Sequence, residues 1–164
     1  GKSVELLKSD IDDWRITFVD TGLHANIGER LLAVKKFVQD EPIFLANYSD
    51  GLSDLPLNSV IDTLKANDSI ACFAGVRTQH SFHALRSDDN NIVQSMGAMN
   101  DSGQWINGGF FALRNRIFDY IEPGDELVEK PFQRLIEKQK LSAIRYDGFW
   151  QSMDTFKDKI NFDR

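Results

Sequence analysis

Continuous apolar runs alternate with amphipathic segments along the first half of the chain. Strands are predicted where the runs are continuous, at 15–19, 42–48 and 69–76. Helices are predicted at 29–38 and 59–66, where apolar residues recur at helical spacing. Strand, helix, strand, helix and strand in this order are typical of a parallel sheet.

The second half of the chain mixes shorter elements. Strand candidates at 81–85 and 91–94 flank the turn sequence SDDNN and predict a hairpin. Further strands are predicted at 105–113 and 141–146, and further helices at 116–121, at 132–138 and from Asp154 or Thr155 onward. We therefore expect an α/β fold, a Rossmann-like, mixed and mostly parallel sheet flanked by helices, as one domain over residues 1–164.

Composition narrows the class of protein. The chain has 164 residues, of which 41% are hydrophobic and 27% charged, as in an ordinary globular domain. The formal net charge is −6 and no dense Lys/Arg cluster occurs, which argues against a nucleic-acid partner. The apolar runs are far shorter than the roughly 20 residues of a membrane span. Because the N-terminus lacks an apolar signal core, a cytoplasmic location is expected.

Several residues are predicted to be structural. Cys72 is the one cysteine and lies in an apolar run, so no disulfide or cysteine metal site is expected. The three histidines have no convincing zinc-ligand spacing. Large side chains on apolar faces are predicted to form the core: Trp14, Phe18, Phe44, Phe73, Phe118 and Leu135.

Two aspartates occupy positions where chemistry is common in α/β proteins. Asp50 follows a predicted buried strand, and ligands of open α/β sheets bind beyond the carboxyl ends of the strands. Asp154 lies in another strand-to-helix passage. Magnesium takes one or two protein carboxylates and completes its shell with water and phosphates. The alternatives are an Asp-Gly turn for Asp50 and a helix N-cap for Asp154.

The segment around Asn107 also allows two interpretations. Gly108 and Gly109 lie inside a predicted strand, where glycines mark a bulge, close packing or the approach of a ligand. Trp105 and Trp150 each adjoin one of these candidate residues, so each is predicted either to form a wall of a pocket or to be buried beneath it.

Five segments, in order and at similar spacing, resemble the glucose-1-phosphate cytidylyltransferases: WRITFVDTG (14–22), YSDGLSD (48–54), WINGGFF (105–111), FDYI (118–121) and GFWQSMDT (148–155). That family belongs to the sugar-nucleotide pyrophosphorylases, which join a nucleoside triphosphate to a sugar 1-phosphate and release pyrophosphate. The resemblance implies the nucleotide-diphospho-sugar transferase fold, substrates of these two classes, Mg²⁺ as cofactor and a homo-oligomer.

Site residues follow from the same resemblance. It implies that Asp50 and Asp154 bind the magnesium ion and are catalytic. It implies a nucleotide-binding role for Gly28 and Arg30. The sugar pocket would be formed by Asn107, Gly108 and Gly109, with Trp105 and Gly51 beside them.

The chain also departs from the family pattern. No glycine-rich loop carrying an arginine occurs, and we expect Gly1 to correspond to a point about a third of the way into a family member. Such loops cradle triphosphates through backbone N–H groups. An alternative to an enzyme is therefore a non-catalytic module that binds a nucleotide sugar or a partner.

Two substitutions concern the ligands themselves. Ala98 stands where the family has a lysine that contacts the sugar phosphate, and the loss of a charge-assisted contact costs about 1.5 to 3 kcal/mol. This leaves the acceptor open between a sugar 1-phosphate and a related phosphorylated compound. Glu29 replaces a glycine of the family pattern beside Arg30, which leaves the nucleotide base open, although cytidine triphosphate is favoured. Glu29 is equally well explained as an acidic residue in the first turn of a helix.

Overall fold

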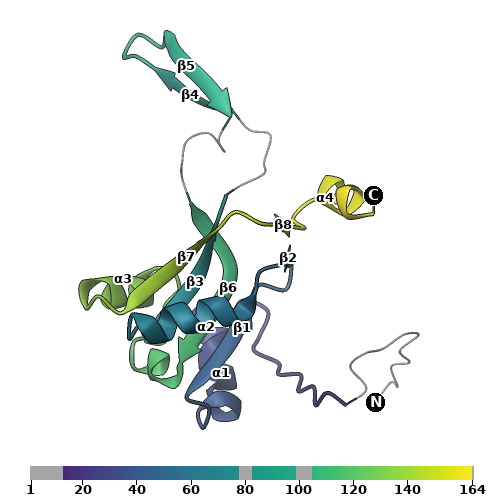
Figure 1. Cartoon of the computed structure of the whole chain (residues 1–164), viewed down its shortest axis with the longest axis vertical. Coiled ribbons are helices and arrows are strands. Elements are labelled where there is room, and N and C mark those ends of the chain that lie inside the picture. Colours follow the sequence, from purple (N-terminus) through teal and green to yellow (C-terminus); the bar gives the residue numbers. More distant parts are fainter. Residues whose placement is uncertain (1–12, 78–82, 99–104, 164) are drawn as a thin grey trace.

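A computed structural model of the chain, which describes residues 13–77, 83–98 and 105–163, has a four-stranded sheet at its centre (Figure 1). The strands lie in the order β1 (Ile43–Asn47), β6 (Ile106–Arg114), β3 (Ala71–Val76) and β7 (Leu141–Tyr146). β6 is antiparallel to both of its neighbours, whereas β3 and β7 are parallel. Three of the four strands thus run in one direction, and the expected mixed, mostly parallel sheet is confirmed.

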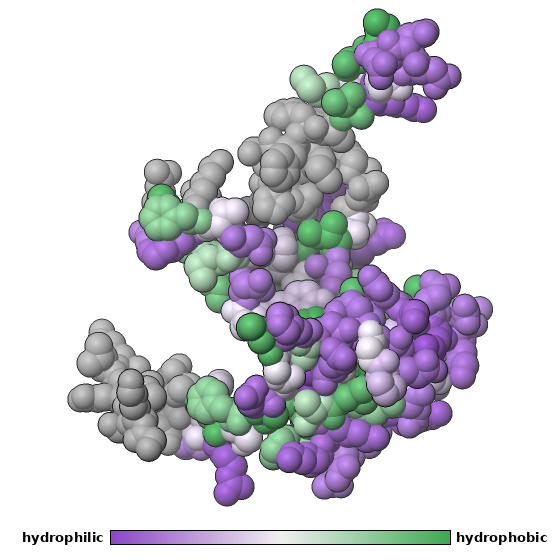
Figure 2. Space-filling view, turned by 180° about the vertical axis from the view of Figure 1, so that it is seen from behind, coloured by the Kyte–Doolittle hydropathy of each residue, from purple (hydrophilic) through white to green (hydrophobic). Residues whose placement is uncertain are grey.

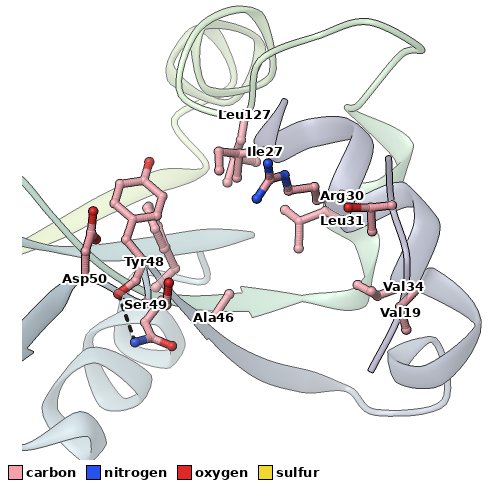
Figure 3. Close-up of a pocket in the computed structure, with 13 residues that line it drawn as sticks. Val19, Ile27, Arg30, Leu31, Val34, Ala46, Tyr48, Ser49, Asp50 and Leu127 are labelled. Carbon is pink, nitrogen blue, oxygen red and sulfur yellow. Dashed lines mark hydrogen bonds between the residues drawn. The ribbon is translucent and has the colours of Figure 1, made fainter. Parts of the chain in front are cut away.

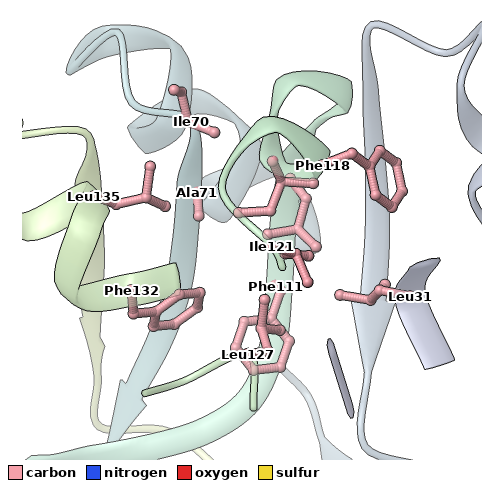
Figure 4. Packing of buried hydrophobic residues seen from close by; sticks show 11 residues of the cluster. Leu31, Ile70, Ala71, Phe111, Phe118, Ile121, Leu127, Phe132 and Leu135 are labelled. Atoms are coloured by element: carbon pink, nitrogen blue, oxygen red, sulfur yellow. The ribbon is translucent and has the colours of Figure 1, made fainter. Parts of the chain in front are cut away.

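Helices cover both faces of this sheet. One face packs against α1 (Ile27–Val38), the 3-10 helix η2 (Asn115–Asp119) and α3 (Lys130–Glu137). Their buried side chains meet in the core drawn in Figure 4, where Leu31, Phe111 and Leu135 come from different elements. The other face packs against α2 (Leu57–Ala66), whose Leu64 is fully buried.

Shorter elements lie outside these layers. β2 (Gly51–Ser53) pairs with β8 (Trp150–Ser152), and α4 (Phe156–Phe162) follows β8. The hairpin of β4 (His83–Ser87) and β5 (Val93–Ala98) stands apart from the sheet in Figure 1. Apolar groups on this hairpin are visible at the top of Figure 2, and its exposed apolar side chains are Leu85, Ile92, Val93 and Met96.

Several sequence predictions are corrected by the structure. Residues 15–19 form no strand and are not paired with another described strand, and Trp14 and Phe18 are 67% and 92% exposed instead of buried. The predicted hairpin is confirmed, although 81–82 lie outside the described residues and the strands begin later than expected. Cys72 is buried, as predicted.

The N-terminus of α1 is held by a network of polar contacts. Asn26 and Glu29 form a reciprocal capping box, which starts the helix two residues before the predicted position. Glu126 accepts a hydrogen bond from the backbone N–H of Ile27 at 3.1 Å, and Asn26 donates to the carbonyl of Gly124 at 3.1 Å. The loop before α3 therefore fixes the start of α1.

Asp125 in the same loop is buried, with an exposed fraction of 4%. Its carboxylate accepts hydrogen bonds from Arg134 at 2.5 Å and from the backbone N–H of Glu122 at 3.2 Å. The hydrogen bond from Arg134 is the main reason why the pKa of Asp125 is lowered. Asp125 thus contributes stability above the ordinary aspartate pKa of about 3.9, and this contribution is lost as the pH falls through the lower folded value.

We expect Asp125→Asn to lower the melting temperature at neutral pH, because the amide cannot replace the charge that Arg134 faces. The difference from the wild type should start to shrink as the pH falls below about 4, and it should be lost once the pH is below the lowered folded pKa of Asp125, where the wild-type carboxylate is also neutral. Thermal unfolding at several pH values measures this, with Asp40→Asn at an exposed turn as control. A difference that persists unchanged at low pH would contradict the proposed role of the charge.

Among the described residues, no helix combines the length and apolar character that crossing a bilayer requires.

Candidate active site

The ribbon formed by β2 and β8 brings the two candidate aspartates to one place. Asp50 directly precedes β2, Asp154 follows β8 by two residues, and Gly51 pairs with Ser152 across the ribbon. The backbone N–H of Met153 also donates to the carbonyl of Asp50 at 2.8 Å. Two segments that are far apart in sequence are therefore joined through the backbone immediately beside both carboxylates.

Both aspartates line a small cleft of about 210 Å³. Five residues predicted for the site meet there: Asp50, Gly51, Asn107, Gly108 and Asp154. The alternative role of Asp154 as a helix cap is wrong, because the side chain of Thr155 caps α4. Asp154 instead accepts a hydrogen bond from the hydroxyl of Ser152 at 2.7 Å.

Tyr48 and Asn107 form one wall of this cleft. The amide nitrogen of Asn107 donates to the phenol oxygen of Tyr48 at 3.3 Å, and its amide oxygen accepts from the N–H of Gly109 at 2.9 Å. Burial, and to a lesser extent the negative charges of Glu126 and Asp50, raise the pKa of Tyr48, although the bond from Asn107 acts in the opposite direction. Tyr48 therefore remains a neutral phenol at physiological pH.

The two glycines after Asn107 are needed for close packing. Gly109 has a φ of +75°, and a Cβ there would lie 2.6 Å from the Tyr48 ring. A Cβ on Gly108 would lie 2.8 Å from a methyl group of Val76. Close backbone packing thus accounts for both glycines, while Gly108 also borders the cleft.

The two tryptophans have different environments. Trp150 is 8% exposed, lines the cleft and donates through its indole N–H to the carbonyl of Gly108 at 2.8 Å. It joins β8 to β6 and so supports the position of Asp154. Trp105 is half-buried and does not line the cleft. It lies one residue before β6, with two arginines over its ring.

A larger cavity of about 720 Å³ adjoins the small cleft, because Tyr48 and Asp50 line both. Figure 3 shows the side chain of Arg30 on α1 and the ring of Tyr48 reaching toward this space from opposite sides. Arg30 is anchored by a hydrogen bond of 2.9 Å from its Nε to the carbonyl of Ala25. Apolar side chains make up much of the remaining wall, among them Leu31 and Leu127.

Gly28 lies in the first turn of α1 but does not line either cavity. It is buried, and a Cβ at this position would lie 2.1 Å from the carbonyl oxygen of Asp125. The structure therefore gives Gly28 a packing role next to Arg30. Its predicted contact with a nucleotide stays a prediction.

The donor set at the cleft suits a magnesium ion that is shared with a ligand. Asp50 and Asp154 supply carboxylates on exposed side chains, and no group of three or more His, Cys, Asp or Glu residues that could hold a metal occurs in the described part of the chain. Magnesium retains several water or phosphate ligands and needs only one or two carboxylates. The residues present therefore fit an ion that takes few ligands from the protein, and do not form a closed structural metal site.

No protein-family model matches the chain, but individual relatives do. Glucose-1-phosphate cytidylyltransferase of Salmonella typhi is 33% identical over 158 residues, which cover 96% of this chain and 62% of the relative. A Bacillus subtilis protein assigned the same activity is 30% identical over 155 residues, which cover 93% of this chain and 60% of the relative. The chain is therefore similar over nearly its whole length to proteins assigned as glucose-1-phosphate cytidylyltransferases.

A solved structure resembles this chain in fold. A Bacillus anthracis protein assigned as a glucose-1-phosphate thymidylyltransferase, solved with sucrose, superposes with a TM-score of 0.61 at 11% identity. The superposition covers 85% of this chain and 60% of that one. The nucleotide-diphospho-sugar transferase fold is therefore confirmed. The chain spans about three fifths of the length of these known proteins.

Sequence reasoning missed two polar residues at the small cleft. Tyr48 stands two residues before Asp50, and its position at the end of an apolar strand was the available signal. Ser152 was not predicted because it lies in a strand of three residues, which is too short to give a recognisable pattern. Both residues set the surroundings of the aspartates.

Proposed function

We propose that the protein is a magnesium-dependent nucleotidyltransferase that joins a nucleoside triphosphate, preferably cytidine triphosphate, to a sugar 1-phosphate and releases pyrophosphate. The observation that carries the proposal is the meeting of Asp50 and Asp154 on one cleft beside Asn107. The choice of base and sugar is supported by the activity assigned to the Salmonella typhi relative. Because the chain spans 62% of that relative, the activity is proposed for the full-length gene product.

The reaction that we propose needs little covalent help from the protein. An oxygen of the sugar phosphate attacks the α-phosphorus, a new P–O bond forms, and the bond to the departing pyrophosphate breaks. The attacking phosphate is already ionised at neutral pH, so no general base has to remove a proton. Catalysis then depends on position and on the neutralisation of phosphate charge.

Asp50 and Asp154 would hold the magnesium ion, which when bound supplies positive charge to the reacting phosphates. The chain's own residues then orient the ligands. Asn107, fixed by Tyr48 and Gly109, presents a rigid polar edge to the acceptor. Arg30 presents a guanidinium to a nucleotide in the larger cavity, whose apolar wall suits a base. We expect the protein to be a homo-oligomer. We also expect it in the cytoplasm, where nucleoside triphosphates are available.

The test measures pyrophosphate release from a panel of nucleoside triphosphates, each incubated with glucose 1-phosphate, magnesium and the full-length gene product. Pyrophosphate release should be fastest with cytidine triphosphate and should disappear when either substrate is omitted or magnesium is chelated. Binding of a nucleotide sugar with no release for any pair would favour a non-catalytic binding module instead.

A further inference from the structure

Two arginines share the ring of Trp105. The guanidinium carbon of Arg77 lies 4.8 Å from the ring centroid and that of Arg145 lies 5.7 Å from it. Both distances are within the range of a cation–π interaction. Arg77 follows β3 directly and Arg145 is the penultimate residue of β7, so two parallel strands bring the pair to their carboxyl ends.

The strand register places this cluster next to the small cleft. Gly75 of β3 pairs with Asn107 on one side and with Arg145 on the other, and directly paired residues project to the same face of a sheet. Neighbouring strands are about 4.8 Å apart, which puts the backbones of Asn107 and Arg145 about 10 Å apart. A Cβ on Gly75 would lie 3.7 Å from Trp105, so the indole covers the gap that the missing side chain leaves.

The cluster carries more positive charge than its local partners neutralise. Asp147 contacts Nε of Arg77 at 3.0 Å, whereas Arg145 has no ion pair with any described residue. A guanidinium stacked on a ring uses its flat face, so its N–H donors remain directed outward in the plane. Both arginines are exposed and can meet a ligand.

We propose that Arg145 and Arg77, held on Trp105, form the phosphate-binding subsite for the acceptor. The inference rests on the proposed function and deepens it by assigning the group that recognises a sugar phosphate. A phosphate monoester fits because it carries up to two negative charges and several oxygens, which match two planar guanidinium forks. Asn107 would then contact the sugar, and the two exposed guanidinium groups would bind the phosphate.

The experiment measures equilibrium binding of glucose 1-phosphate and of inorganic phosphate to the full-length protein by calorimetry. One positive charge is removed in each of the variants Arg145→Gln and Arg77→Gln. Arg145→Lys keeps a positive charge at position 145 but lacks the planar set of guanidinium N–H donors. Arg86→Gln on the hairpin is the matched control, because it removes an exposed arginine away from the cluster. Thermal unfolding establishes that each variant is folded.

We expect about tenfold weaker binding of both phosphates to Arg145→Gln, partial recovery in Arg145→Lys, and no change in Arg86→Gln. Equal affinity in Arg145→Gln and the control, or no binding of either phosphate to the wild type, would overturn the subsite. Pyrophosphate release by the wild type, together with unchanged phosphate affinity in Arg145→Gln, would refute the subsite and leave the proposed function in place. Weakened phosphate binding to Arg145→Gln, together with no pyrophosphate release by the wild type for any pair of triphosphate and acceptor, would instead refute the proposed function and retain the subsite.

Discussion

Asp50→Asn and Asp154→Asn should each lower the rate of pyrophosphate release about 10³-fold. Each substitution keeps the shape of the side chain but removes a negative charge that the proposed magnesium ion requires. The double variant should be little worse than either single variant, because residues that act as one unit are not additive. Steady-state release of pyrophosphate from cytidine triphosphate and glucose 1-phosphate measures the loss.

Asp54→Asn is the matched control for this experiment. Asp54 lies in the same turn sequence as Asp50 but does not line the cleft, and it accepts a hydrogen bond from the phenol of Tyr146. An asparagine oxygen can still accept that bond, so most of the activity should be retained. Equal losses in Asp54→Asn and Asp50→Asn would show that a general charge effect, and not a metal ligand, is being measured.

Gly28→Ala should destabilise the protein by about 3 kcal/mol. Replacing glycine by alanine in a helix normally stabilises it by up to about 1 kcal/mol, so the expected sign is reversed. The reason is the distance of 2.1 Å between the new Cβ and the carbonyl oxygen of Asp125, which backbone movement alone can relieve. Chemical denaturation with a linear extrapolation gives the free energy of unfolding.

Gly51→Ala provides the comparison, because the nearest contacts of its Cβ would be a ring carbon of Phe110 and the carbonyl oxygen of Tyr48, both at 3.7 Å. We expect its free energy of unfolding to stay within about 1 kcal/mol of the wild type. If Gly28→Ala were as stable as Gly51→Ala, the close packing of α1 on the loop at Asp125 would be disproved.

The sheet and its helices could largely be predicted from apolar patterns, but the neighbours of each strand could not. Periodicity identified 42–48 and 69–76 as strands, yet it carries no information that β6 inserts between them. Residues 15–19 have the composition of a strand, but a strand also needs a partner for its backbone, and none is found among the described residues. Composition therefore predicts which residues favour an extended conformation, and pairing with another strand decides whether they form a strand.

The site shows a similar division. Asp50 could be predicted from its place after a buried strand, whereas Asp154 had only the family resemblance in its favour. Their meeting depends on pairs such as Gly51 with Ser152, in strands of three residues that give no recognisable alternation. Trp105 could be identified as a candidate, but its contacts with Arg77 and Arg145 could not be predicted, because the two arginines lie at the ends of two other strands.

The shortness of the β2–β8 ribbon has a thermodynamic consequence. An ion that needs both carboxylates binds only the paired form, so its apparent affinity is the intrinsic affinity multiplied by the fraction of molecules in which the ribbon is closed. A ribbon of three residues per strand opens far more readily than the central sheet. Occupation by the ion would in turn hold the ribbon closed, so that loading of the cleft and local order at Met153 become two aspects of a single equilibrium.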